Sequence, residues 1–445
     1  MVVSATKRFA RFAASLRHED LPPAVAEMAR RCLIDWLGIA ITGSRQPLAP
    51  LLLKTIGQLG GHRQALMVGA GGARTSVAHA AMCNATFSHA IDYDDVHMPS
   101  GVHATAPVWA AALAVAQWKQ LSAAEATAAF VAGYEVMVRI GNVAGFAMIQ
   151  RHFHPTGTLA YFGAAVAAGR LLGLDEHRMA MAIGIAAGQA GGLTQVRGTM
   201  SKPFFAGHAA HGGVLSALMA ANGFESAADA IEGPEGVFAT YAEGIDEGIA
   251  FDGLGERYEL LNNRFKAYAA CAVTHPVLDG LLQLRARIGD VSRISEIVAH
   301  VHPYATEYVN RPHVTTGLAG KFSMQYCAAV VLLDGQAQEA QFIDERAGDA
   351  ALQALASRVR MVGVAGMAMD RCEVEVKLAD GSALRCAVSD ITGSPARPIA
   401  LPDLELKFRS LASAACDDAD IDAMLGLLRA WPAGNVDELL ALASR

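Results

Sequence analysis

Residues 22–39 read PPAVAEMARRCLIDWLGI, and the pattern within this stretch decides the fold. Apolar side chains recur in it at spacings of three and four residues, at Val25, Met28, Cys32, Trp36 and Ile39. That spacing predicts an amphipathic helix with one buried face, and the two prolines suit its first turn, where a missing N–H costs nothing. Similar alanine-rich segments follow at 75–90, 105–118, 122–146, 156–173, 176–191 and 206–222. The chain is therefore predicted to be helical up to about residue 262.

The pattern changes after about residue 265. Residues 294–302, ISEIVAHVH, alternate between apolar and polar as a strand does. Residues 372–388, CEVEVKLADGSALRCAV, predict a hairpin with a favoured two-residue turn at Asp380-Gly381. Helical stretches lie between these strands, near 316–334 and 349–358.

The order of these segments predicts two domains. Strands mixed with helices after an all-helical half indicate a separate α+β domain, and the helical tail from Leu404 onward could return to the first domain. We expect a mainly α protein with a large all-helical domain, residues 1–265 plus 404–445. A smaller α+β domain, residues 266–403, is inserted in it.

The composition excludes several classes of protein. The 445 residues are 53% hydrophobic and 18% charged, which excludes disorder, because a chain this apolar can bury enough surface to fold. The net charge of −7 gives nucleic acid no basic surface to bind. Seven cysteines without paired spacing fit a reducing compartment. We expect a cytoplasmic protein with no nucleic-acid partner.

The mean hydropathy of +0.27 raises the question of a membrane. The longest stretches without Asp, Glu, Lys or Arg are 96–118 and 203–224, and both contain several histidines and other polar residues. They do not resemble the roughly 20-residue apolar run of a spanning helix. The N-terminus lacks the apolar stretch of a signal peptide, and Glu19 and Asp20 argue against a transit peptide. We expect no membrane partner.

Polar groups gather in four segments, of which the first two flank predicted helices. The first is HAIDYDDVHMPSGVH at 89–103, a loop between helices of the kind that often carries catalytic groups. Its aspartates could instead cap helices or face solvent. In the second, RHFHPTGT at 151–158, His154 precedes a helix that begins near Pro155. The helix dipole disfavours an imidazolium there, so a neutral His154 could act as base, hydrogen-bond donor or simple helix cap.

The other two segments supply cations and a further histidine. In RGTMSKP at 197–203, glycine and proline predict a turn that holds Lys202 near the next helix start, where an ammonium suits a carboxylate. A surface lysine is the alternative. The fourth segment runs from Arg264 through Lys266 to His275, at the predicted domain junction, where small-molecule clefts are common. His275 could instead be a buried structural histidine.

Several cofactor classes lack their sequence signals. The possible metal ligands are Asp92, Asp94, Asp95, His97 and His103. The sequence has no HExxH, paired CxxC or calcium-loop spacing, so we expect no metal. It also has no P-loop, no GxGxxG after a strand and no GxSxG, so we expect neither a nucleotide cofactor nor a serine hydrolase.

Taken together, six motifs in order resemble the MmgE/PrpD family, which includes 2-methylcitrate dehydratase, cis-aconitate decarboxylase and iminodisuccinate epimerase. They are DWLGIAITGS at 35–44, HAIDYDDVH at 89–97, HPTGTLAYFGAA at 154–165, GTMSKPFFAGHAAHGG at 198–213, KAYAACAVTH at 266–275 and GKFSMQYCAA at 320–329. The resemblance runs over nearly the whole chain. It implies the two-domain fold described above, a homodimer, an active site between the domains and a small polycarboxylate substrate, with no organic cofactor.

The resemblance also implies which residues act. By motif position the catalytic groups fall on Asp92, His103, His154, Lys202 and His275. For substrate binding we add Arg197, Lys266, Lys321 and His97. Each family reaction moves charge onto carbon beside a carboxylate, or breaks a bond there, which requires a tuned acid or base and cations that hold carboxylates.

These residues can be given hypothetical roles. His154 and His103 would form the proton-transfer pair. Lys202 would bind one substrate carboxylate and His275 would donate to a second, while Asp92 would orient or charge a histidine.

The leading prediction is a 2-methylcitrate dehydratase-like hydro-lyase. A decarboxylase of the cis-aconitate type and an epimerase of the iminodisuccinate type are alternatives, because the same histidines and lysine can serve all three. An inactive helical binding or scaffold protein is the alternative outside the enzymes. The sequence departs from the family pattern at Val96, Phe205, Ala269 and Ala270, where relatives commonly carry other residues. These departures point away from a standard 2-methylcitrate site.

Overall fold

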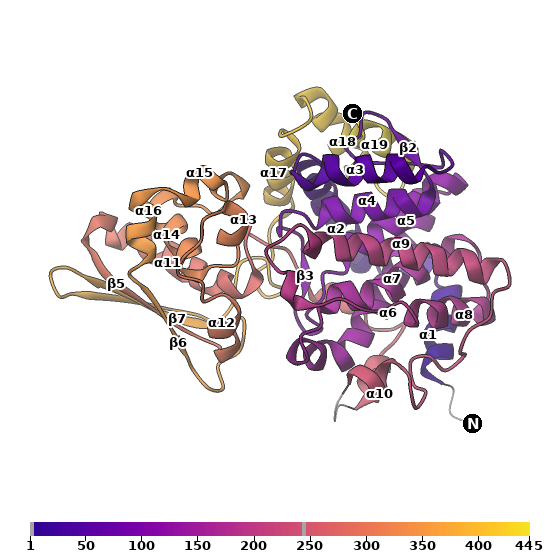
Figure 1. Ribbon diagram of the computed structural model, residues 1–445, viewed down its shortest axis with the longest axis horizontal. Helices are drawn as coiled ribbons and strands as arrows, with labels where there is room; N and C mark the ends of the chain where they lie inside the picture. Colours follow the sequence, from indigo (N-terminus) through magenta and orange to yellow (C-terminus); the bar gives the residue numbers. More distant parts are fainter. Residues whose placement is uncertain (1–3, 243–245) are drawn as a thin grey trace. The chain divides into compact units, whose positions relative to one another are not determined.

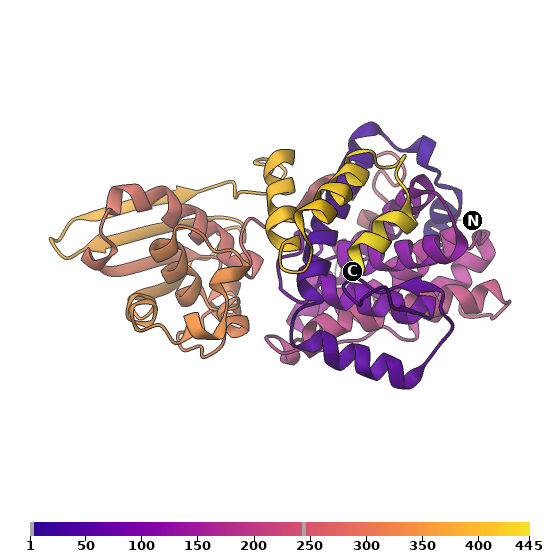
Figure 2. The same cartoon turned by 90° about the horizontal axis from the view of Figure 1, so that it is seen from above.

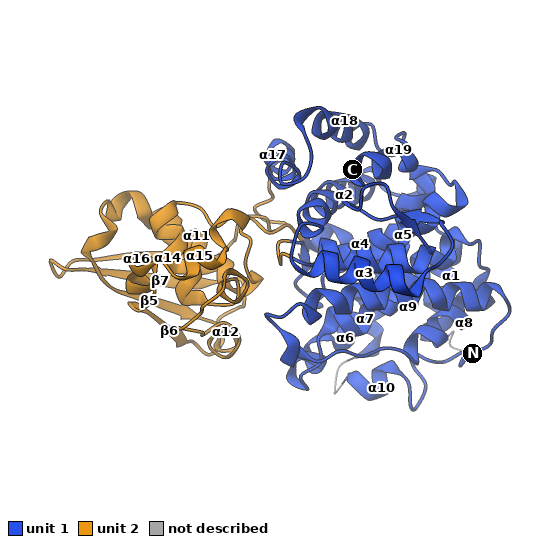
Figure 3. Ribbon diagram, turned by 45° about the horizontal axis from the view of Figure 1, so that its top comes forward, with its two compact units in different colours: residues 1–90, 94–263, 400–445 blue, residues 91–93, 264–399 orange. Residues whose placement is uncertain are grey.

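The computed structural model describes residues 4–242 and 246–445, and the chain divides into two compact units (Figure 3). Unit 1 comprises residues 1–90, 94–263 and 400–445, and unit 2 comprises residues 91–93 and 264–399. The predicted class, a mainly α protein with a small sheet, is confirmed. The predicted domain boundaries lay at 265/266 and 403/404. The three residues 91–93 were not expected in the smaller unit.

Unit 1 is built from helices, with three two-residue strands at its loops. Its helices are α1 (Ala5–Ser15), α2 (Pro23–Gly43), α3 (Leu48–Leu59), α4 (Val77–Ser88), α5 (Thr105–Lys119), α6 (Ala123–Gln150), α7 (Pro155–Leu171), α8 (Glu176–Ala187), α9 (Ser201–Ala221), α10 (Val237–Tyr241), α17 (Leu401–Ala412), α18 (Asp418–Arg429) and α19 (Val436–Ala443). Its strands are β1 (Ala65–Leu66), β2 (Arg74–Thr75) and β3 (Val96–His97). Strand β4 (Asn263–Arg264) begins at the last residue of the central segment of unit 1, and its second residue belongs to unit 2.

Helix α2 forms where the sequence predicted it, beginning at Pro23 after Pro22. Its apolar face is buried, with Cys32 and Ile39 fully inaccessible to solvent, although Met28 is only half-buried. The C-terminal α17 packs on this helix, where Gly38 leaves room for Phe408. Figure 2 shows the C-terminal helices, in yellow, against the indigo N-terminal helices of unit 1.

The core of unit 1 is a stack of helices in the order α6, α7, α9 and α4 (Figure 1). Small residues allow the close crossings. A Cβ on Gly207 of α9 would lie 2.0 Å from Thr86 Oγ1 and 2.5 Å from the Met82 carbonyl oxygen of α4. By length and composition α9 is the one helix among the described residues that could span a membrane, yet 56% of its apolar window is buried. Its place in the stack identifies it as a core helix.

Unit 2 is a four-stranded sheet with helices on one face. Its strands are β5 (Ile294–Val301), β6 (Val359–Gly363), β7 (Cys372–Leu378) and β8 (Ala383–Val388). Its helices are α11 (His275–Ile288), α12 (Pro303–Tyr308), α13 (Gly317–Gly320), α14 (Met324–Asp334), α15 (Asp344–Ala347) and α16 (Ala350–Ala356). The strand order is β6-β5-β7-β8, with β5 and β6 parallel and the other pairs antiparallel. Helix α11 packs on β7 and β8.

The structure corrects three details of the sequence prediction. The hairpin does turn at Asp380-Gly381, but residues 379–382 all lie outside the strands, because the Asp380 carboxylate accepts hydrogen bonds from Ser382 and shapes a longer turn. Strand β6 was missed, since its five residues alternate too weakly to show a period. The helix expected at 316–334 is interrupted at residues 321–323, where the Ser323 side chain caps α14.

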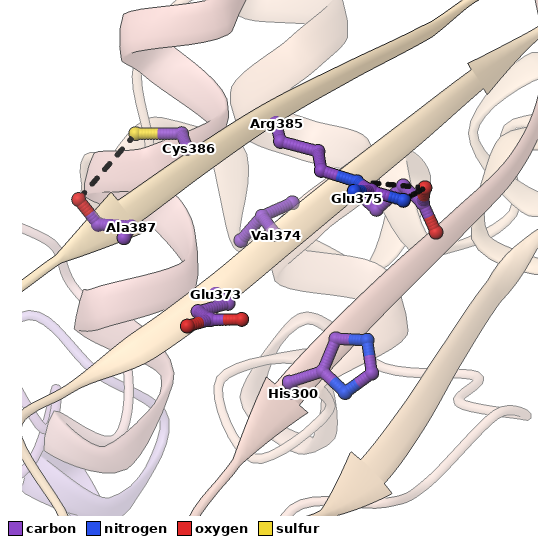
Figure 4. A pocket seen from close by; sticks show the side chains of 7 residues that line it. All are labelled: His300, Glu373, Val374, Glu375, Arg385, Cys386 and Ala387. Atoms are coloured by element: carbon purple, nitrogen blue, oxygen red, sulfur yellow. Dashed lines mark hydrogen bonds and ion pairs between the residues drawn. The ribbon is translucent and has the colours of Figure 1, made fainter.

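A shallow pocket of about 310 Å³ lies on the uncovered face of this sheet (Figure 4). Alternate residues of β7 point to it, with Glu373 and Glu375 outward while Val374 and Val376 face the helices. Arg385 of β8 pairs with Glu375 at 2.6 Å. Two of the charged lining groups are thus engaged in a cross-strand ion pair, and the sequence-predicted site residues lie elsewhere.

Candidate active site

The loop between α4 and α5 brings a carboxylate between two histidines. His89 follows the last residue of α4, and His103 lies just before α5. Asp94 Oδ2 lies 2.7 Å from His89 Nδ1 and 3.1 Å from His103 Nδ1. All three residues belong to unit 1, and we call them the Asp94 cluster. Asp94 thus shares a hydrogen bond with His89 and lies within ion-pair distance of His103.

Burial and pairing set the charges in the Asp94 cluster. Burial would raise the pKa of Asp94, but the two histidines outweigh it and hold that pKa well below its ordinary value. Burial lowers the pKa of His89 to about 4 despite the attraction of Asp94, and the positive charge of Lys202 adds to the effect. At neutral pH the cluster thus holds an ionised carboxylate and a neutral His89. Solvent reaches His103, whose side chain is 13% exposed.

His154 lies beside this cluster, and its ring centre is 6.2 Å from that of His89. It caps α7, because its Nδ1 accepts a hydrogen bond of 3.1 Å from the Gly157 amide. Burial, and then the charge of Lys202, hold the pKa of His154 well below its ordinary value. A neutral ring carries one proton, and Nδ1 is an acceptor here, so that proton is on Nε2. His154 is both a helix cap and a neutral N–H donor.

Two cations act on the same histidines. The charge of Lys202 lowers the pKa of both His89 and His154, and that of Arg197 lowers the pKa of His154. Lys202 is buried, and it is the second residue of α9 rather than part of a preceding turn. The helix begins before Pro203, because proline is tolerated in a first turn. Both cations therefore lie near enough to His154 to act on its charge.

Asp92 occupies a different environment from Asp94. It belongs to unit 2 and has a left-handed backbone, with φ of 54°. Lys266 Nζ donates to the Asp92 carbonyl oxygen at 2.7 Å and lies 3.2 Å from its carboxylate. The structure shows an ion pair between Asp92 and Lys266, and the predicted role of Asp92, to orient or charge a histidine, stays a prediction. Asp94 is the aspartate that contacts the two histidines of the cluster.

The other predicted residues of unit 2 are held tightly within it. Lys321 Nζ donates to the Ile91 carbonyl oxygen and pairs with Glu339. His275 is fully buried, and burial together with the charge of Lys266 lowers its pKa to about 3. Its Nε2 lies 3.2 Å from the Ala270 carbonyl oxygen, so its single proton is donated to the backbone. The predicted donation from His275 to a substrate carboxylate stays a prediction.

His97 is not brought to the Asp94 cluster. It is completely buried, with Nδ1 2.8 Å from Ser100 Oγ and Nε2 3.1 Å from Glu259 Oε2. The bond from His97 lowers the pKa of Glu259 to about 2, ahead of the opposing effect of burial. Both ring nitrogens of His97 are thus engaged within unit 1, and its contact with substrate stays a prediction.

The residues predicted to act did not include His89 or Asp94, although Asp94 was named as a possible metal ligand. Both lie in the quoted motif HAIDYDDVH, but the spacing of its three aspartates does not say which one faces the histidines. The third, Asp95, is buried and accepts hydrogen bonds from Thr105 and Asn263. Burial raises the pKa of Asp95 to about 7. The three aspartates of DYDD, close to His89 and His97, were the sequence signal for a site in this loop. Only the fold shows which aspartate contacts the histidines.

Comparison with known proteins gives this arrangement a context. The MmgE/PrpD N-terminal domain matches residues 7–248, and the MmgE/PrpD C-terminal domain matches residues 268–427. The chain belongs to the MmgE/PrpD family. The C-terminal match extends beyond unit 2 into α17 and α18, so the family's sequence division and the two compact units do not coincide.

Curated relatives of this MmgE/PrpD protein are enzymes. It is similar to the cis-aconitate decarboxylase of Aspergillus terreus, with 27% identity over 98% of this chain and 95% of the relative. It is also similar to the cis-aconitate decarboxylases of Homo sapiens, at 25% identity over 96% and 92% of the two chains, and of Mus musculus, at 26% over 93% and 88%. The matches cover nearly the whole length of each protein.

Proposed function

We propose that this protein is a lyase that decarboxylates a small unsaturated tricarboxylate of the cis-aconitate class, with the proton transfers made by its own side chains. The observation that carries the proposal is the Asp94 cluster beside His154 and two cations. It combines a carboxylate-linked imidazole, a neutral N–H donor and positive charge in one buried place. The full-length similarity to cis-aconitate decarboxylases favours decarboxylation over the other family reactions.

The proposed steps use each group for one task. Lys202 and Arg197 hold substrate carboxylates, because charge-assisted hydrogen bonds to carboxylate are strong in a buried site. When the carbon–carbon bond to the leaving carboxylate breaks, its electron pair passes into the unsaturated system, and His154 Nε2–H donates a hydrogen bond to the charge that develops. His103, supported by Asp94, then delivers a proton to carbon. The products are carbon dioxide and a dicarboxylate.

Dehydration is the second candidate, and the two kinds of histidine favour it. A dehydratase removes a proton from carbon and protonates a leaving hydroxyl group, so it needs a base and an acid. His103 on Asp94 suits the first task, and His154 with its proton on Nε2 suits the second. An epimerase would need proton transfer at both faces of one carbon.

We also propose that the protein is a cytoplasmic homodimer. Light scattering of the purified protein tests its oligomeric state.

One experiment separates these reactions. Purified full-length protein is incubated with cis-aconitate, 2-methylcitrate, citrate and iminodisuccinate in buffer with chelator, and products are followed by NMR. We expect carbon dioxide and a dicarboxylate from cis-aconitate. Loss of water from 2-methylcitrate alone would replace decarboxylation by dehydration, and no turnover of any compound would favour the inactive binding protein. The His208→Gln variant, changed at an exposed histidine, is the matched control.

A further inference from the structure

We propose that the Asp94 cluster is a binding site for a divalent ion of the zinc class, and that the bound ion stops turnover. One ligand atom from each of His89, Asp94 and His103 lies within 4.8 Å of the others. The Asp94 oxygen is 2.7 Å and 3.1 Å from the two imidazole nitrogens. Ligands about 2.0–2.2 Å from a tetrahedral zinc ion lie about 3.3 Å apart, so small shifts would admit the ion. The inhibitory part of this inference rests on the proposed function.

The donor set has the chemistry of such a site. Two imidazoles and one carboxylate leave a fourth position open, and zinc, cobalt, nickel and copper ions accept this mixture of nitrogen and oxygen ligands. Three buried atoms of the cluster, His89 Nε2, His103 Nδ1 and Asp94 Oδ1, have no hydrogen-bond partner within the described part of the chain. The unused Asp94 oxygen gives the carboxylate a second lone-pair site for the ion. Because His103 is the partly exposed member, an ion would enter the cluster from the side of His103.

Binding and catalysis compete for the same atoms. An ion on His103 and Asp94 takes the carboxylate contact that His103 needs for proton transfer, and it fills the space beside His154. The positive charge of Lys202 acts on His89 and therefore opposes the ion. We expect the Lys202→Met variant to bind the ion more tightly than the wild type, by about tenfold for a like charge removed from a buried site.

The test measures metal binding without using activity. Full-length protein stripped with chelator is titrated with Co²⁺, and the visible d–d absorption of a four-coordinate site is recorded, with Zn²⁺ affinity measured by calorimetry. We expect one ion per chain. The His89→Gln and His103→Gln variants should each weaken Zn²⁺ affinity at least tenfold, while His208→Gln leaves it unchanged. Circular dichroism shows whether each variant is folded.

Two outcomes overturn the proposal. Absence of any Co²⁺ absorption, or equal weakening in His208→Gln, would mean that the cluster is not the site. Bound Zn²⁺ with unchanged turnover would remove the inhibitory part. The His154→Asn variant separates this inference from the proposed function, because it should lose turnover and keep its metal affinity. A protein inactive on every carboxylate would still report the metal site through Co²⁺.

Discussion

Asp92, Asp94 and Asp95 lie within four positions of one another and occupy three electrostatic environments. Asp92 pairs with Lys266, Asp94 lies between two histidines, and Asp95 is buried among hydrogen-bond donors with its pKa raised to about 7. The chemical identity of the side chain is the same in all three. Its task is decided by the neighbour that the backbone turns it toward.

The Asp94→Asn variant should lose most of its activity. An amide keeps the size of the side chain but removes the negative charge that supports His103, so we expect kcat to fall by about 10²- to 10⁴-fold. Asp95→Asn is the matched control. Because Asp95 accepts hydrogen bonds from Thr105 and Asn263 rather than from a histidine, its replacement should change kcat by less than about threefold. Steady-state kinetics check both, and equal losses would contradict the assignment.

Capping and catalysis by His154 can be separated. Asparagine is among the best helix N-caps, so His154→Asn should keep the stability that the Gly157 amide bond gives α7 while losing the Nε2 donor. We expect turnover to fall at least about 10²-fold with an unchanged melting temperature. His154→Ala should lose turnover and also about 1 kcal/mol of stability. Retained activity in His154→Asn would show that the histidine serves only as a cap.

At the scale of elements, the crossing of α9 over α4 depends on one missing Cβ. Gly207→Ala places a methyl group against Thr86 and the Met82 carbonyl oxygen, so we expect it to destabilise the protein by about 1–3 kcal/mol. Gly57→Ala, in α3, meets no atom within 4 Å and should stabilise its helix by up to about 1 kcal/mol. Urea unfolding measures both. Similar effects of the two changes would contradict the close crossing.

The same two helices stack histidines, and this predicts sensitivity to acid. His211 of α9 lies between His79 of α4 and His208, at ring-centre distances of 5.4 Å and 6.3 Å. Burial, then the charges of these neighbours, lower the pKa of His211 to about 4. Between pH 6.5 and 4 the unfolded chain therefore binds a proton that the folded chain does not, and stability falls as the pH falls through this window.

His211→Asn should accordingly lose less stability than the wild type between pH 6.5 and 4. Melting temperatures recorded across that range check the prediction. His62→Asn, at an exposed histidine, is the control and should follow the wild type. Parallel curves for His211→Asn and the wild type would show that the stacked histidines do not resist protonation.

Helices and strands were predicted correctly from the sequence where the spacing of apolar residues repeated over several turns. The apolar face of α2 spans many turns, and its Pro22-Pro23 start is explicit, so its position was predictable. Strand β6 has five residues, and its register is set by pairing with β5, which lies far away in the sequence. The start of α9 was placed late, because the glycine and proline near Lys202 resemble a turn. Short elements defined by a distant partner carry too little local signal.

For the whole molecule, the sequence located the polar segments but did not show which of their residues lie together in unit 1 and which lie in unit 2. Segments 89–103, 151–158 and 197–208 supply the histidines and cations of unit 1, as their shared polarity within apolar sequence suggested. Lys266 and Lys321 were predicted to bind substrate, and in the structure their ammonium groups donate to the backbone carbonyl oxygens of residues 92 and 91. Which of these donors meet carbonyl groups depends on tertiary contacts that no spacing along the chain records.

Residues 91–93 belong to unit 2 although residues on either side of them belong to unit 1. For recombination between relatives, the smaller unit is therefore not a single cassette. A transplanted 264–399 segment would leave the donor's residues 91–93 behind, so its two buried ammonium groups would have to bond the host's own residues 91 and 92. Chimaeras that exchange 91–93 together with 264–399 should express as folded protein more often than those that exchange 264–399 alone. Modularity in this chain is a property of its contacts and not of its contiguous stretches.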